Sequence, residues 1–131
     1  MIALDTSVIV RYLVQSPPEP ARRAGELLDG GGEIGIPVVV LLETAHVLRT
    51  IYAVPRPDVA TVLIELLTRR NVRLLGLGVD DAIDALVRAR ALPGTPIADA
   101  LIVAMAKAAG ARPLYTFDLG LARHGIEIAV P

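Results

Sequence analysis

The sequence predicts a parallel α/β fold, a single domain in which helices cover both faces of a sheet. The chain has 131 residues, the length of one ordinary domain. Short apolar runs alternate with segments of helical periodicity, which is the order of elements in parallel α/β sheets. Apolar residues make up 53% and aromatic residues only 3% of the chain, so the core must be built from aliphatic side chains. Such side chains suit helices packed on a parallel sheet.

Five short apolar runs have the composition and the flanking turn residues of buried strands. These runs lie at residues 2–4, 34–36, 72–75, 113–116 and 126–130. Helical periodicity fills the intervals between them. The expected helices begin directly after Asp5 and cover residues 20–28, 37–51, 58–69, 80–91 and 95–109, with a short helical turn after Asp118.

Proline and glycine mark the expected helix boundaries. Pro17 ends the first helix, and Gly110 ends the last long one. The valines that follow Pro37 favour a strand by propensity, but we interpret Pro37 as the first turn of a helix. Thr95 is expected to be the N-cap of the last long helix, with Pro96 at its first position.

Cysteine usage and hydropathy indicate the cellular compartment. The chain has no cysteine, which excludes a disulfide framework, a thiolate zinc site and a cysteine nucleophile. The start of the chain reaches Asp5 without the basic and long apolar regions of a signal peptide. The most apolar stretch, residues 34–42, is too short to span a bilayer. We therefore expect a soluble, cytoplasmic protein without a membrane segment.

Four acids lie where apolar segments should bring them to one edge of the sheet. Asp5 and Asp118 directly follow predicted strands, and Glu43 and Asp99 lie on predicted apolar helices. Ligands of open α/β sheets bind outside the carboxyl ends of the strands. Mg²⁺ takes oxygen ligands and is usually held by a few carboxylates together with water and substrate phosphate. The pattern therefore predicts a divalent-cation site and phosphodiester chemistry.

Three of these acids also have purely structural interpretations. Asp5 is a good N-cap for the helix that follows it. Asp118 suits the turn that opens the next segment. Glu43 fits a solvated helix face together with His46 and Thr50. Taken one at a time, each acid leaves both interpretations open, and only the ordered set favours a site.

Asp99 is harder to explain structurally. With Thr95 as the N-cap, Asp99 falls one position beyond the residue that closes a capping box. Its neighbours along the helix are apolar, and a carboxylate in such surroundings is costly to desolvate without a partner or a metal ion.

The formal net charge of −1 is unusual for a nucleic-acid-binding protein, which normally has a basic excess. Without the four acids, which contribute −4, the remaining residues carry +3. Bound cations would offset the acids and leave a positive working surface. Most of the basic residues are arginine, whose planar fork suits phosphate.

Four segments carry a family resemblance, in the order and spacing of that family and over essentially the whole chain. They are residues 4–7, 42–43, 97–102 and 115–118. With them the chain resembles PIN-domain ribonucleases of the VapC toxin type. The resemblance implies one domain over residues 1–131, a three-layer α/β/α sandwich with a mostly parallel central sheet of four to five strands.

The resemblance also implies an activity, the cleavage of RNA by a Mg²⁺- or Mn²⁺-dependent endoribonuclease. Its catalytic and metal-binding residues would be Asp5, Glu43, Asp99 and Asp118. Ser7 and Thr116 match small polar positions that support the cluster by hydrogen bonds. Arg11 lies one helical turn beyond Ser7, where it would either contact RNA phosphate or remain an ordinary surface residue.

The chain departs from the family pattern after the fourth acid. Many relatives carry a further aspartate there, whereas this chain has Leu121, Ala122 and Arg123. The resemblance therefore leaves open whether one or two ions bind. It also implies a cognate antitoxin that covers the acidic site, and a homodimer. An apolar face at residues 38–51 or 58–67 would serve for the dimer, although core packing explains those residues equally well.

Other functions fit the residues less well. A haloacid-dehalogenase-like phosphatase needs a second aspartate two residues after the first, where this chain has Ser7. A receiver domain would need an acidic pair near the first strand. His46 and His124 are interpreted as a surface and a turn residue, not as catalytic groups. The main alternative is a catalytically inactive PIN-like module that binds RNA or a partner.

Overall fold

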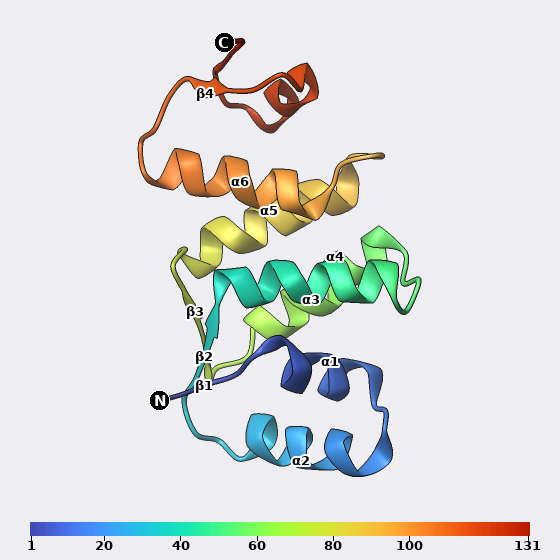
Figure 1. Cartoon of the computed structure of the whole chain (residues 1–131). Helices are drawn as coiled ribbons and strands as arrows, with labels where there is room; N and C mark the ends of the chain where they lie inside the picture. Colours follow the sequence, from blue (N-terminus) through green and yellow to red (C-terminus); the bar gives the residue numbers. More distant parts are fainter.

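The structure is a computed structural model that describes all residues, 1–131. Figure 1 shows the helices stacked one upon another, with the carboxyl terminus at one end of the molecule and the amino terminus beside β1, far from it. In chain order the elements are β1 (Ile2–Ala3), α1 (Thr6–Val14), α2 (Pro18–Asp29), β2 (Ile34–Pro37), α3 (Val38–Thr50), α4 (Arg56–Leu67), β3 (Val72–Leu75), α5 (Val79–Ala91), α6 (Ile97–Ala108), β4 (Leu114–Tyr115), the 3₁₀ helix η1 (Leu119–His124) and β5 (Ile128–Ala129).

All five predicted strands are present, and every strand pair is parallel. The predicted α/β class of PIN-like architecture is thereby confirmed. Within it the strands are divided between two sheets, one in the order β1-β2-β3 and the other formed by β4 and β5. The division follows from helix packing, because α5 and α6 lie between the first sheet and β4 (Figure 1).

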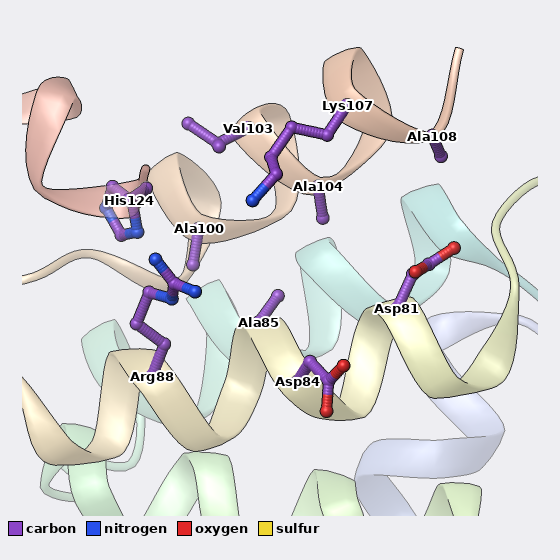
Figure 2. A pocket seen from close by; sticks show the side chains of 10 residues that line it. All are labelled: Asp81, Asp84, Ala85, Arg88, Ala100, Val103, Ala104, Lys107, Ala108 and His124. Carbon is purple, nitrogen blue, oxygen red and sulfur yellow. The ribbon is translucent and has the colours of Figure 1, made fainter. Parts of the chain in front are cut away.

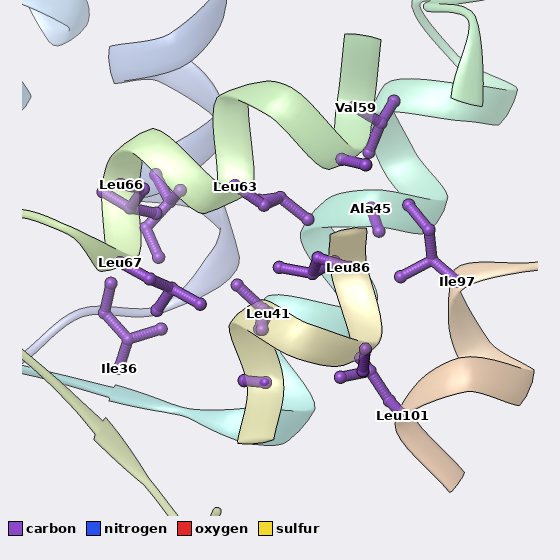
Figure 3. Close-up of a cluster of buried hydrophobic side chains, with 14 of the residues drawn as sticks. Ile36, Leu41, Ala45, Val59, Leu63, Leu66, Leu67, Leu86, Ile97 and Leu101 are labelled. Atoms are coloured by element: carbon purple, nitrogen blue, oxygen red, sulfur yellow. The ribbon is translucent and has the colours of Figure 1, made fainter. Parts of the chain in front are cut away.

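The main core lies where α3, α4, α5 and α6 meet beside β2 (Figure 3). Leu41, Leu63 and Leu86 are completely buried there, each on a different helix. Removal of such side chains from water is the largest favourable contribution to folding. A second, small cluster of Val103, Leu121 and Ile126 joins α6 to the carboxyl-terminal segment. The second sheet is thus attached through α6 rather than through the first sheet.

Two predicted helix starts are wrong in detail. Pro96, not Thr95, is the N-cap of α6, and no side chain caps this helix. Thr95 is buried, and its hydroxyl accepts a hydrogen bond from Nη1 of Arg123 at 3.3 Å. Tertiary contact therefore replaces the local cap. Asp99 consequently lies in the first turn of α6, where the helix dipole favours an acid.

Pro37 was expected in the first turn of α3, but it ends β2 and is the N-cap of that helix. The three valines that follow are helical, as predicted against their strand propensity. Tertiary packing commonly outweighs propensity in this way. None of the helices has both the length and the apolar character needed to traverse a lipid bilayer.

Candidate metal and nucleic-acid site

Asp5 is separated from β1 by Leu4 alone and is the N-cap of α1. Its Oδ1 atom accepts hydrogen bonds from the Ser7 hydroxyl at 2.7 Å and from the Val8 amide at 3.3 Å. The hydrogen bond from the Ser7 hydroxyl is the largest cause that lowers the pKa of Asp5 below its ordinary value. The Val8 amide also lowers this pKa, and the nearby positive charge of Arg11 lowers it least. The structural role and a functional role are therefore compatible, because the cap keeps an exposed carboxylate ionised.

Glu43 approaches the same region from α3. The Thr6 hydroxyl donates a hydrogen bond to Oε1 of Glu43, across 37 residues of sequence. The connection has a topological reason, since β1 and β2 are parallel neighbours and each is followed by a helix at its carboxyl end. Asp5 and Glu43 are thus brought to the same edge of the first sheet, as the sequence predicts.

A groove runs along α3 from Glu43 towards the start of α6, with a volume of about 690 Å³. His46 and Arg49 lie on its α3 side, and Ala98 lies on its α6 side. His46 is exposed, in agreement with its interpretation as a surface residue. The groove places basic and apolar surface next to Glu43, and its arginines are suited to binding a phosphate group.

Asp99 is half-buried on α6, one residue beyond the groove residue Ala98. Its charge acts on His124 of η1 and favours the protonated imidazole. Asp99 thus belongs in part to the surroundings of the carboxyl-terminal segment, and no hydrogen bond joins it to Asp5 or Glu43.

Asp118 follows β4 and is the N-cap of η1, where its Oδ1 accepts a hydrogen bond from the Gly120 amide at 2.9 Å. The Asp118 amide donates to the Thr116 hydroxyl at 2.9 Å, so Thr116 supports this turn. β4 pairs only with β5, and α5 and α6 lie between it and the first sheet (Figure 1), so the position after β4 is not beside the position after β1. In this structure the contacts of Asp118 are therefore those of a residue that opens a turn.

The four acids are not gathered into one cluster. No three aspartate, glutamate or histidine side chains lie close enough together to form a metal-binding group. The Asp5 and Glu43 pair does have suitable chemistry, because both offer exposed carboxylate oxygens at one edge of the sheet. Mg²⁺ is often held by only one or two carboxylates with water and substrate phosphate. The pair fits such an ion, and Asp99 and Asp118 remain predicted ligands.

Two structural features near the candidate sites are not predicted by the sequence. Thr6 is buried and connects the Asp5 turn to Glu43, but it was not singled out from its polar neighbours. His124 is buried at the end of η1 and lines a cavity, although it was expected to be a turn residue. In the sequence, Gly125 is the one residue that indicates the end of η1, where it adopts the left-handed conformation. A glycine at this position predicts a turn but not which side chains pack against it.

Comparison with protein-family models gives a match to the PIN domain over residues 2–127. Among curated proteins, no sequence matches the chain. The family match includes the segments of Asp5, Glu43, Asp99 and Asp118, and it covers the first sheet and β4 and ends just before β5. We conclude that the chain belongs to the PIN-domain family, whose members are usually metal-dependent nucleases.

Proposed function

We propose that the protein is a Mg²⁺- or Mn²⁺-dependent endoribonuclease and the toxin of a toxin-antitoxin pair. Membership of the PIN-domain family supports the nuclease role. The single structural observation that carries the proposal is the Thr6 to Glu43 hydrogen bond, which holds Glu43 beside the turn where Asp5 caps α1. The resemblance to VapC-type toxins supports RNA as the substrate and an antitoxin as the partner.

In this proposal Asp5 and Glu43 hold the ion, and Asp99 and Asp118 are further ligands on the sequence pattern alone. A bound divalent ion supplies a water of lowered pKa and offsets charge on the leaving oxygen. The chain's own residues prepare the site. Ser7 and the Val8 amide keep Asp5 ionised, and Thr6 fixes the orientation of Glu43.

Arg11 is proposed to contact RNA phosphate beside Asp5. Its guanidinium donates to the Ser7 carbonyl at 3.1 Å, so it is held one turn along α1 from the carboxylate. Arg11 is exposed and forms no salt bridge. An arginine that is free of acids is suited to pairing with a phosphodiester.

The antitoxin and a second copy of the chain are also part of the proposal. Apolar side chains are exposed on α3 and just after it, where Val39 is 68% and Ile51 71% accessible. A helical face of this kind suits a helix of a partner protein. Light scattering of the purified chain, alone and with the product of a neighbouring gene, measures both associations directly.

The nuclease proposal is tested by cleavage of single-stranded RNA with Mg²⁺, with Mn²⁺ and in excess EDTA. We expect Asp5→Asn and Glu43→Gln to lower the cleavage rate at least about 100-fold, since metal-assisted catalysis supplies several kcal/mol. Asparagine caps a helix about as well as aspartate does, so Asp5→Asn should remain folded, with an unfolding temperature only slightly below that of the parent because the charge is lost. Asp58→Asn, at an exposed acid in the first turn of α4, is the matched control and should cleave normally.

Undiminished cleavage by both variants, or in EDTA, would contradict the assignment. The separation of the Asp118 strand from β1 favours one other candidate, a PIN-like module that binds RNA without cutting it. RNA binding by the parent protein with no cleavage in either metal ion would establish that alternative. Asp99→Asn and Asp118→Asn, assayed in the same way, decide whether these acids belong to the site.

A further inference from the structure

A second cavity, of about 230 Å³, lies between α5 and α6 and is closed at one end by the last residue of η1 (Figure 2). Its walls are the alanine-rich faces of the two helices, so backbone and small side chains leave the space open. The polar side chains that line it are Asp81, Asp84, Arg88, Lys107 and His124. The cavity is separate from Asp5 and Glu43, neither of which lines it.

Two cations converge at the η1 end of the cavity. A Cβ atom built on Gly125 would lie 3.5 Å from Nη1 of Arg88 and 3.9 Å from Nζ of Lys107. Both charged groups therefore reach one small region beside the end of η1. Neither forms a salt bridge, and neither donates a hydrogen bond within the protein. Two unpaired cations so close together repel each other unless an anion lies between them.

His124 forms the floor of the same end of the cavity (Figure 2). Its side chain is 3% exposed, and Nδ1 is buried without a hydrogen-bond partner. Buried polar atoms are normally paired, so an unpaired nitrogen here requires an explanation. Burial and the neighbouring charge of Arg88 lower the pKa of His124, which fits a neutral imidazole with one N–H to donate.

The two acids that line the cavity lie apart from this cationic end, and Asp99 of α6, whose charge acts on His124, does not line it. Asp81 and Asp84 line the opposite part of the cavity, and their carboxylates point away from the Arg88 guanidinium (Figure 2). Neither forms a salt bridge with Arg88 or Lys107, although Asp84 and Arg88 are one helical turn apart. The cations are thus left available to a ligand.

We propose that this cavity binds a phosphate group through Arg88 and Lys107, with His124 as a further hydrogen-bond donor. Arginine presents paired N–H groups that match phosphate oxygens, and lysine adds a compact charge. The ligand is either inorganic phosphate or a backbone phosphate of RNA. Binding at this cavity does not depend on nuclease activity.

The test uses the full-length Asp5→Asn protein in EDTA and a phosphate-free buffer, so that RNA stays intact. The chain has only two histidines, His46 and His124, and a single lysine, so each gives a resolved NMR signal. Inorganic phosphate is added in one series and a short single-stranded oligoribonucleotide in another, at constant pH. We expect the imidazole signal of His124 and the ammonium signal of Lys107 to shift together, while inorganic phosphate leaves His46 unchanged.

Arg88→Gln and Lys107→Gln should each weaken the binding about tenfold or more, because each removes a charge-assisted hydrogen bond. Arg90→Gln is the matched control, since Arg90 is on the same helix but bonds Thr61 of α4 at 3.4 Å. A response to either ligand that is lost in the two variants supports the site and identifies the source of the phosphate. No shift with either ligand, or shifts of equal size in Arg88→Gln and the parent, would overturn the proposal.

Discussion

The Thr6 hydroxyl donates a hydrogen bond to the Glu43 carboxylate, and this bond joins the first turn of α1 to the second turn of α3. Thr6 is buried, whereas both acids on either side of it are exposed. A buried hydroxyl of this kind has few alternative orientations, so it holds Glu43 at a fixed position relative to Asp5. The relationship between the two acids is therefore set by a residue that is itself neutral.

Replacement of Thr6 should impair the site without removing a carboxylate. Thr6→Val keeps the branched shape but removes the donor, so we expect about a 10- to 100-fold loss of metal affinity or cleavage rate, as for other residues that orient metal ligands. Titration of Mn²⁺ binding by isothermal calorimetry measures the effect. Thr6→Ser retains the hydroxyl and is the control, and an equal loss in both variants would contradict an orienting role.

The pKa of Asp5 should lie below that of an ordinary aspartate, because the carboxylate accepts hydrogen bonds from the Ser7 hydroxyl and the Val8 amide. A lowered native pKa means that this contribution to stability is present at neutral pH and is lost as the pH falls through the native pKa. The carboxyl carbon signal of Asp5 reports the midpoint. Ser7→Ala removes the largest cause and should raise the pKa, whereas an unchanged midpoint would show that the bond has no effect.

Acid should destabilise the protein through His124. Burial is the main cause that lowers the pKa of His124 below 6.5 in the native state. The positive charges of Arg88, Arg123 and Lys107 lower this pKa further, and the negative charge of Asp99 opposes them. The unfolded chain then binds a proton before the native one does, so the free energy of unfolding falls as the pH drops below about 6.5 and levels off below the native pKa.

Urea denaturation at a series of pH values measures this effect. His124→Asn should show a smaller decrease in stability between neutral and acid pH than the parent. His46→Asn changes an exposed histidine and should behave as the parent does. Identical pH profiles for all three proteins would contradict a buried, neutral His124.

The core between the helices should be sensitive to loss of volume. Leu63 has no exposed surface and packs on α4 against the main core (Figure 3). Leu63→Ala should therefore lower the free energy of unfolding by about 2–5 kcal/mol, from lost burial and the cavity left behind. Ile102→Ala, at a side chain of α6 that is 48% exposed, is the control and should cost much less in the same urea titration.

Local structure could be predicted from the sequence. The five strands and the six long helices were predicted from periodicity and from proline and glycine, with starts displaced by two residues at α2, α4 and α6. Asp5 after β1 and Glu43 on α3 were placed at one edge of the sheet because two parallel strands each feed a helix at that edge. The order of strands and helices can be predicted from the sequence, since each element depends on residues that are close together along the chain.

Contacts between distant segments could not be read in this way. Thr95 was expected to cap α6, but it bonds Arg123 instead, because a tertiary partner was available. The burial of His124 depends on how η1 packs against α5 and α6. No periodicity in a segment of six residues encodes that packing.

The chain by itself determined that acids follow two strands and occupy two apolar helices, because residue order fixes the end of a strand at which a side chain emerges. Only the tertiary structure decided which of those ends are neighbours. Packing of α5 and α6 placed β4 with β5, away from β1, so Asp5 adjoins Glu43 while Asp118 caps η1 in the second sheet. Which strands pair depends on which helix faces are buried between the sheets. The packing energy that decides this comes from contacts throughout the molecule and not from any one segment.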